Sequence, residues 1–221
     1  MNEALGHGVY SFAEAAKLTG LRTQRIREWF LGRNVKPGKK PFLPGDYAPV
    51  DDQHAISFLD LIDVYVAGKL RERDVPLQTL RRVFKKMAND LKTKHPFSRR
   101  EIQTDGEDVF IRSVDDEGKE ELIEVLRGQR VFVDIIKPFL KQIDYDSDKL
   151  LAVRWHIAQE VVVDPAICFG KPILEEVSIP TVVLFDAYRA NNNDAELVGR
   201  WYKVRAEQVD AAVRFEERMA A

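Results

Sequence analysis

Apolar and polar positions near the start of the chain follow the helical period and predict two short helices joined by a turn. Ser11 can cap the first helix, and Glu14, three residues later, completes a capping box. Gly20 can adopt the left-handed conformation that ends a helix. Thr23 can then cap a second helix. The predicted apolar positions of this second helix are Ile26, Trp29 and Phe30.

Two longer helices are predicted between residues 57 and 91. Residues 32–49 are rich in glycine, proline and lysine, which favours a loop or a small hairpin. Ser57 then restarts helical periodicity, with an aspartate at the third position, and this helix is predicted to end near Arg73. A proline at residue 76 breaks the pattern before a basic amphipathic helix over residues 77–91.

The remaining sequence mixes strand and helix signals. Alternating runs predict a β-hairpin over residues 102–126, and apolar spacings of three and four predict a helix over residues 132–143. Strands are expected at residues 150–157 and 161–163, followed by an extended segment with turns up to Thr181. Capping and proline signals then predict three helices: one over residues 180–190, one that begins at a cap on Asn193 or Asp194 and ends at Tyr202, and one over residues 205–219.

These elements predict an α+β fold that is mainly helical. The expected parts are a winged helix-turn-helix with a basic wing at residues 1–56, a middle region with helices and a small β-hairpin at residues 57–157, and a C-terminal strand with a three-helix unit at residues 158–221. The three tryptophans, Trp29, Trp155 and Trp201, all lie in apolar patterns, and we expect each in the core.

Charge is distributed unevenly along the chain although its net value is only −2. Residues 1–100 carry 19 Lys and Arg against 11 Asp and Glu, a net charge of +8, and the remainder carries 15 against 25, a net charge of −10. This asymmetry favours a polyanionic partner for the first half and a basic partner surface for the second. The alternative is that the two halves attract one another.

The sequence contains no motif typical of catalysis, of cofactor binding or of a metal site. Its four histidines are far apart in sequence, its single cysteine, Cys168, has no neighbouring cation pattern, and no phosphate-binding glycine loop or nucleophile elbow occurs. An aspartate-rich turn at residues 144–148 lacks the later ligands of a calcium loop. We therefore expect a non-catalytic protein without cofactor. Because no apolar run approaches about 20 residues, we also expect a cytosolic protein that does not span a membrane.

Basic and polar side chains at the second predicted helix indicate a DNA-reading surface. Arginine and glutamine bind base edges, and threonine at a helix start suits phosphates. Residues 17–40 hold eight positive charges and one negative charge, enough to neutralise several phosphates. A solvated helical hairpin is the plainer alternative. The predicted DNA-binding residues are Arg22, Thr23, Gln24, Arg25, Arg27, Arg33, Lys36, Lys39 and Lys40.

Two segments also resemble known families. Residues 13–30, the following loop and residues 56–84 resemble the N-terminal winged helix-turn-helix of MerR-type regulators, although no long dimerising helix follows. Residues 161–217 resemble the domain-of-unknown-function-433 family, chiefly at the Asp164-Pro165 step and the Gly170-Lys171-Pro172-Ile173 run. That family usually has a second glycine where Phe169 stands here.

The combination of both segments resembles VapB-type antitoxins. This resemblance implies a protein that binds a PIN-like ribonuclease toxin, reads operator DNA as a homodimer and represses the shared operon. The residues expected to bind the partner are Gly170, Lys171, Pro172, Arg200 and Arg205. The alternative is a stand-alone MerR-like transcriptional regulator whose C-terminal part senses a ligand or another protein.

Overall fold

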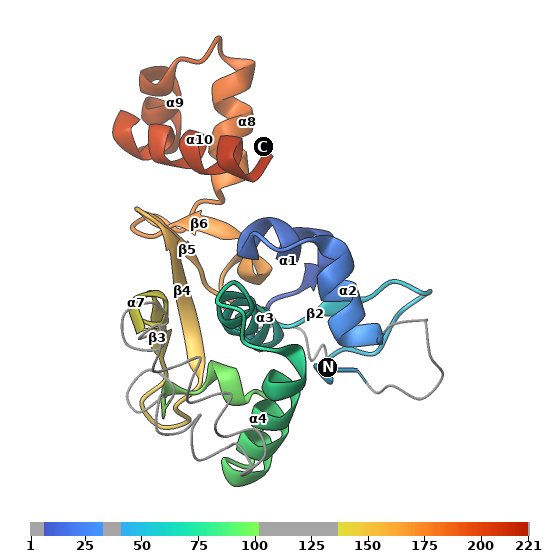
Figure 1. The fold of residues 1–221 in the computed structure, drawn as a ribbon. Helices are drawn as coiled ribbons and strands as arrows, with labels where there is room; N and C mark the ends of the chain where they lie inside the picture. Colours follow the sequence, from blue (N-terminus) through green and yellow to red (C-terminus); the bar gives the residue numbers. More distant parts are fainter. Residues whose placement is uncertain (1–6, 33–40, 102–136, 221) are drawn as a thin grey trace. The chain divides into compact units, whose positions relative to one another are not determined.

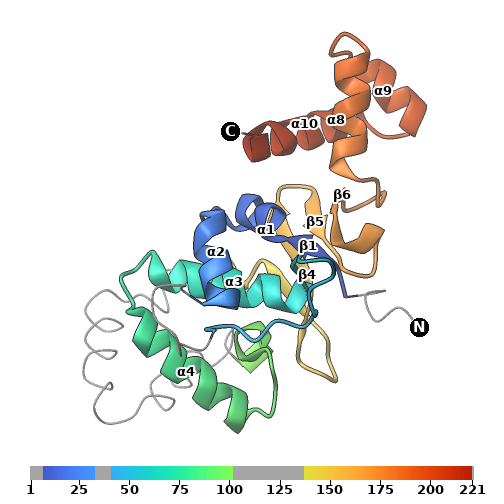
Figure 2. The same ribbon diagram turned by 90° about the vertical axis from the view of Figure 1, so that its right-hand side faces the viewer.

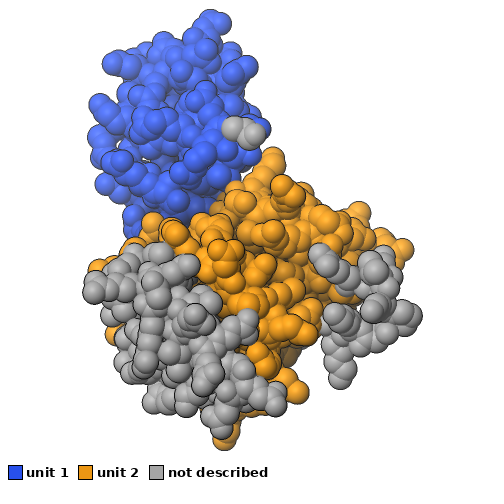
Figure 3. All heavy atoms as spheres, viewed as in Figure 1, with its two compact units in different colours: residues 1–9, 154–221 blue, residues 10–153 orange. Residues whose placement is uncertain are grey.

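The computed structural model describes residues 7–32, 41–101 and 137–220, which fall into two compact units. The N-terminal unit comprises the described residues within Tyr10–Val153, and the C-terminal unit comprises residues 7–9 together with residues 154–220 (Figure 3). The predicted α+β class with mainly helical content is confirmed (Figure 1). The predicted β-hairpin at residues 102–126 and residues 132–136 of the helix predicted at residues 132–143 lie outside the described residues. The described part of that helix, α7, covers only Lys137–Leu140, and Ile143, which was predicted in the helix, instead begins a strand. The predicted division at residues 56 and 157 stays a prediction.

The first helix of the N-terminal unit begins and ends where the sequence predicts. Helix α1 spans Phe12–Thr19, the Ser11 hydroxyl accepts the Glu14 N–H, and the Glu14 carboxylate accepts the Ser11 N–H at 2.8 Å. Gly20 ends the helix with a φ of 72°. The short strand β1 (Tyr10–Ser11) precedes α1 and pairs antiparallel with β2 (Ala55–Ile56).

Helix α2 spans Thr23–Leu31, and its predicted cap is wrong by one residue. Arg22 is the N-cap, with extended backbone and no capping side chain, and its carbonyl accepts the Arg25 N–H at 2.9 Å. Thr23 is already helical, so its hydroxyl does not take the capping position. The predicted core positions of α2 are confirmed: Ile26, Trp29 and Phe30 are all buried.

Helix α3 (Phe58–Arg71) is the centre of this unit, with α1 and α2 on one side and α4 (Leu77–Asp90) on the other (Figure 2). All but two of its residues that precede Arg71 are buried, as expected of a helix packed on every side. The predicted capping box at Ser57 is confirmed. A chain of edge-to-face aromatic contacts links the elements around α3: Trp29 with Phe42, Phe42 with Phe84, and Phe84 with Phe97.

Strands of a second, four-stranded antiparallel sheet follow in the order β3-β4-β5-β6. Their bounds are Ile143–Tyr145, Ala152–Ala158, Val161–Val163 and Pro172–Leu174. The expectation of one C-terminal strand followed by an extended segment with turns missed a strand within that segment, because β6 pairs with β5 through Leu174 opposite Val161 and Pro172 opposite Val163. Proline is tolerated at the first residue of a strand, so Pro172 does not prevent this pairing.

Three helices complete the C-terminal unit. They are α8 (Thr181–Ala190), α9 (Ala195–Tyr202) and α10 (Ala206–Ala220), each within one residue of its predicted bounds. Asp194 caps α9 by accepting the Leu197 N–H at 2.8 Å. Helix α10 packs against both α8 and α9 (Figure 1). Among the described residues, no helix is long and apolar enough to cross a bilayer.

Candidate functional site

The exposed face of α2 carries the DNA-binding residues predicted on that helix. Arg22, Thr23, Gln24, Arg25 and Arg27 are all exposed, while the intervening Ile26 is fully buried. Within the described part of the chain, no carboxylate forms a salt bridge with any of these three arginines. The helix therefore presents its guanidinium groups to solvent. Arg33, Lys36, Lys39 and Lys40 lie outside the described residues.

The C-terminal end of α2 is held by the segment that follows the undescribed loop. The Trp29 carbonyl accepts hydrogen bonds from the Phe42 N–H at 2.7 Å and from the Leu43 N–H at 3.0 Å. Both Phe42 and Leu43 are buried. Carbonyl groups at the end of a helix need such partners, and here they come from the chain itself, which fixes the position of α2 in the core.

The turn between α1 and α2 is fixed from the opposite side by α3. A Cβ atom placed on Gly68 would lie 2.8 Å from Cδ1 of Leu21, a distance that real Cβ atoms do not reach. Leu21 is buried in the turn, directly before the exposed Arg22. Glycine at residue 68 thus lets the turn approach the central helix closely, and the start of α2 is set by packing rather than by a capping side chain.

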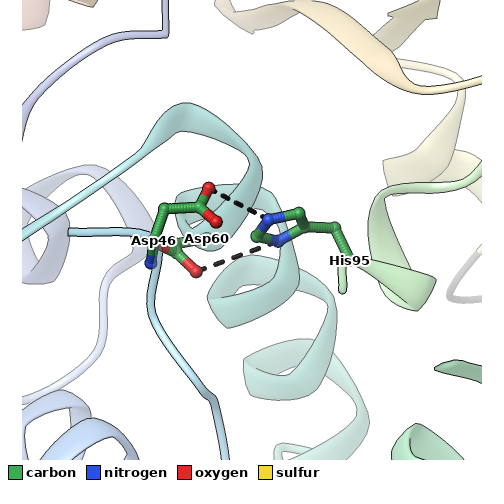
Figure 4. A group of neighbouring side chains, drawn as sticks. All are labelled: Asp46, Asp60 and His95. Atoms are coloured by element: carbon green, nitrogen blue, oxygen red, sulfur yellow. Dashed lines mark hydrogen bonds and ion pairs between the residues drawn. The ribbon is translucent and has the colours of Figure 1, made fainter. Parts of the chain in front are cut away.

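A buried charge cluster lies beside this arrangement (Figure 4). His95 Nε2 lies 3.0 Å from Asp46 Oδ2, and His95 Nδ1 lies 2.9 Å from Asp63 Oδ2 and 3.8 Å from Asp60 Oδ1. The side chains of Asp60, Asp63 and His95 are all at least nine-tenths buried, and that of Asp46 is 24% exposed. One imidazole ring therefore joins the 41–46 segment to helix α3.

The pKa values of this cluster show which groups carry charge. Burial alone would lower the pKa of His95, but the hydrogen bonds to Asp46 and Asp63 raise it to about 10. The hydrogen bond to His95 lowers the pKa of Asp46 to about 2 despite its partial burial. Burial raises the pKa of Asp63 to about 6 and also raises that of Asp60. The ring is thus an imidazolium that donates from both nitrogens.

Ligand-type atoms of Asp46, Asp60 and His95 lie within 4.8 Å of one another, a spacing that could accommodate a metal ion. Both ring nitrogens, however, already contact carboxylates at hydrogen-bonding distance, so the protonated ring itself is the cation between the acidic groups. The sequence carries no local signal for this cluster, because 49 residues separate Asp46 from His95 and no motif joins them.

The predicted partner-binding loop contains three consecutive residues with left-handed backbone. Cys168, Phe169 and Gly170 have φ values of 49°, 57° and 79°. The loop is held by hydrogen bonds from the Gly170 N–H to the Ile167 carbonyl and from the Val9 N–H to the Phe169 carbonyl. Gly170 is buried, Lys171 is exposed and Pro172 begins β6, whereas Cys168 and Phe169 are exposed. The loop is thus a fixed turn that displays Phe169.

Phe169→Gly is expected to give a more stable protein than Phe169→Ala by about 1 kcal/mol, because left-handed backbone penalises any residue with a Cβ. Thermal or urea unfolding of the two variants measures this difference. Equal stability would show that φ at residue 169 is not held positive in solution. Because both variants lack the aromatic ring, the loss of its contacts cancels in the difference between their stabilities.

The two predicted partner-binding arginines are exposed but not equivalent. The Arg205 guanidinium lies 3.1 Å from the Glu176 carboxylate, whereas Arg200 Nη1 lies 3.8 Å from Glu196 one turn earlier on α9. Between them, Trp201 is 57% exposed, which contradicts the prediction that it belongs to the core. The buried positions of α9 are Val198 and Gly199, so Trp201 lies outside the buried face.

Comparisons with known proteins support a relationship along most of the chain. Residues 161–215 match the family described as "Protein of unknown function (DUF433)", in agreement with the resemblance of that segment. The chain is 24% identical over 199 residues to "Putative antitoxin VapB45" from Mycobacterium tuberculosis (strain ATCC 25618 / H37Rv), which covers 82% of this chain and 83% of the relative. It is therefore a distant relative of that protein.

The fold also has a counterpart among solved structures. The X-ray crystal structure of Rv2018 from Mycobacterium tuberculosis superposes with a TM-score of 0.73 and 21% sequence identity, covering 92% of this chain and 96% of the other. This similarity extends over both compact units and supports the fold described above.

Proposed function

We propose that this chain is the antitoxin of a toxin–antitoxin pair, a non-catalytic protein that neutralises a PIN-like ribonuclease toxin and regulates its own operon. The observation that carries the proposal is the similarity to a protein named as an antitoxin, which extends over four-fifths of both chains. The relation thus includes the basic N-terminal half and the acidic remainder.

The C-terminal unit is the proposed toxin-binding part. Residues 154–221 hold 8 Lys and Arg against 11 Asp and Glu, and the unit displays Phe169, Lys171, Arg200 and Arg205 on its surface. Arginine and aromatic side chains provide much of the binding energy in protein interfaces. In the proposed complex an arginine pairs with an acidic group of the toxin's catalytic site, as charge-assisted hydrogen bonds favour.

Coexpression tests this part of the proposal. The product of the adjacent gene, expressed alone, is expected to arrest growth, and coexpression with this chain is expected to restore growth and to yield a complex on copurification. A chain truncated after residue 153 provides the matched control, since it retains the N-terminal unit and lacks the proposed binding unit. Absence of both rescue and complex would remove the antitoxin assignment.

The N-terminal unit is the proposed operator-binding part. Helix α1, its turn and α2 form the proposed helix-turn-helix, in which α2 enters the major groove and its N-terminal end lies near phosphates. A homodimer would place two copies of α2 on a palindromic operator. The exposed arginines of α2 and the net charge of +8 over residues 1–100 support this assignment.

A stand-alone regulator is the second candidate, and the same exposed face of α2 supports it. The two candidates differ in what occupies the C-terminal unit. An antitoxin requires a toxin encoded beside it, whereas a stand-alone regulator would bind its operator with unchanged affinity in the presence of the adjacent gene's product.

A further inference from the structure

Trp201 differs from the other tryptophans of the chain in its exposure. Trp29 and Trp155 are 3% and 2% exposed, whereas Trp201 is 57% exposed. An indole is among the largest apolar side chains, and burying one in an interface removes a large area from water. Its position outside the buried face of α9 means that the fold of the C-terminal unit does not use most of this surface.

The backbone that carries Trp201 is held rigidly. Lys203, the C-cap of α9, has a φ of 58°, and the Val204 N–H donates to the Gly199 carbonyl at 2.9 Å. A Cβ atom on Gly199 would lie 2.8 Å from the Val204 carbonyl oxygen, so glycine is needed for the turn to pack this closely. A side chain on a fixed turn loses little backbone freedom on binding, which favours affinity.

The far side of the same turn is tied to the rest of the unit. The Glu176 carboxylate accepts hydrogen bonds from the Arg205 guanidinium at 3.1 Å and from the side-chain amide (Nε2) of Gln208 at 2.8 Å. The side-chain oxygen (Oε1) of Gln208 accepts the backbone N–H of Arg205 at 3.0 Å. The turn from α9 into α10 is thereby fixed at both ends.

All the charged residues near Trp201 in the sequence are basic. Arg200, Lys203 and Arg205 are exposed, and no acidic residue occurs between residues 197 and 206. A second copy of the chain bound symmetrically through this patch would bring together the same three basic residues, two of which lie near the exposed carboxylates of Glu176 and Glu196, and would offer less charge complementarity than an acidic surface. An acidic partner surface gives the complementary arrangement.

A nucleic acid fits this patch less well than an acidic protein. Arg205 and Arg200 each already lie within 4 Å of a carboxylate, and the unit carries three more acidic than basic residues. A phosphate backbone would have to approach Glu176 and Glu196 as well as the arginines. A protein surface can instead accept the indole in an apolar pocket and pair with the cations at its rim, the usual organisation of an interface.

We propose that Trp201 is the central anchor of the toxin-binding interface, inserted into an apolar pocket that is rimmed by acidic groups of the toxin, with Arg200 and Lys203 at the rim. The inference rests on the proposed antitoxin function and extends it by naming the surface and the chemistry of its partner. Phe169 and the 170–172 loop are then not the main source of affinity.

The test uses the full-length chain and the purified product of the adjacent gene. Trp201→Ala is expected to weaken the complex by about 30-fold or more, the loss typical of an interface hot spot. Trp201→Phe should retain most of the affinity, because an aromatic ring still enters the pocket. Val183→Ala on α8, which is 37% exposed in the same unit, is the matched apolar control and should leave the affinity unchanged.

Charge and accessibility provide independent measurements. Arg200→Glu should weaken the complex and reduce its salt dependence, whereas Arg189→Glu on α8 should not. Complex formation should also protect the exposed tryptophan from an aqueous fluorescence quencher, and Trp201→Phe should abolish this protection. Unfolding curves of both Trp201 variants should match the wild type, because the indole is mostly exposed.

Four results would overturn the inference. Unchanged toxin affinity of Trp201→Ala, with the wild-type complex intact, removes the anchor and leaves the antitoxin function standing. If the wild type forms no complex with the toxin, both the anchor and the antitoxin function are excluded. A homodimer that dissociates on Trp201→Ala assigns the patch to a second copy of the chain. Loss of binding to a 20-nucleotide single-stranded RNA in that variant assigns it to nucleic acid.

Discussion

Replacing His95 by alanine is expected to destabilise the N-terminal unit by roughly 3–5 kcal/mol, the usual cost of removing one partner from a buried ion pair. The ring contacts Asp46 and Asp63 within hydrogen-bonding distance, and both Asp60 and Asp63 have almost no exposed surface. Without the imidazolium, these carboxylates would face one another with no internal cation. Urea unfolding of the wild type and of His95→Ala measures the difference in their free energies of unfolding.

The same cluster predicts a pH dependence with a defined sign. The pKa of His95 rises from an ordinary value of 6.5 to about 10 on folding, so its stabilising contribution is fully present below pH 6.5 and is lost as the pH rises toward 10. The pKa of Asp63 is raised by burial to about 6, so its contribution is present below its ordinary pKa of 3.8, is lost as the pH rises to about 6, and does not change between pH 7 and pH 10. Stability of the wild type minus that of His95→Ala should therefore decrease from pH 7 to pH 10.

A double variant separates the charge effect from the loss of packing. Asp63→Asn introduced into His95→Ala removes one buried negative charge, so part of the lost stability should return. A cavity left by the missing ring would persist in the double variant. If His95→Ala alone costs less than about 1 kcal/mol, a value typical of exposed pairs, the cluster is open to water and the described network is absent in solution.

Arg25→Ala combined with Arg27→Ala is expected to weaken binding to operator DNA by at least about tenfold at physiological salt and to reduce the salt slope by about two, one for each phosphate contact. Both side chains are exposed on α2, on either side of the buried Ile26. Titrating DNA from the promoter region of the gene that encodes this chain with each protein, at several salt concentrations, measures both the affinity and its salt slope.

Arg73→Ala is the matched control for this prediction. Arg73 is an exposed arginine of the same unit, beyond the end of α3 rather than on α2. Its loss removes one charge from the unit without altering the proposed reading helix. Equal effects of the control and the double variant, per charge removed, would indicate a diffuse electrostatic attraction and contradict a reading role for α2. Unfolding curves should be unchanged in all three proteins.

Local sequence rules predicted the helices well because their determinants lie within a few residues. Ser11 and Ser57 begin their helices through capping boxes, and Gly20 ends α1 with the left-handed backbone expected of it. The exposed and buried positions of α2 likewise follow from a single period. The cap of α2 was misplaced by one residue, since no local contact distinguishes Arg22 from Thr23 at that turn. The helix predicted to reach residue 143 was also too long, because Ile143 belongs to β3.

Features that depend on distant residues were not predicted. Strand β6 forms because Ile173 and Leu174 pair with residues of β5. A glycine and a proline at residues 170 and 172 favour a turn in the local sequence, so the sequence pattern did not indicate a strand there. The His95 cluster joins residues from a loop, a helix and a later turn. The exposure of Trp201 depends on which face of α9 meets α10, which apolar spacing alone left ambiguous.

The Asp60 carboxylate links local and distant structure through one atom. Its Oδ2 accepts the Ser57 N–H at 3.1 Å, which caps α3, and the Asp46 N–H at 3.0 Å, which anchors the segment bonded to the end of α2. The amide of Asp46 cannot be satisfied in this way until the first turn of α3 has formed. The loop and the central helix therefore gain their order together, so that a residue outside any regular element shares the folding cooperativity of the core.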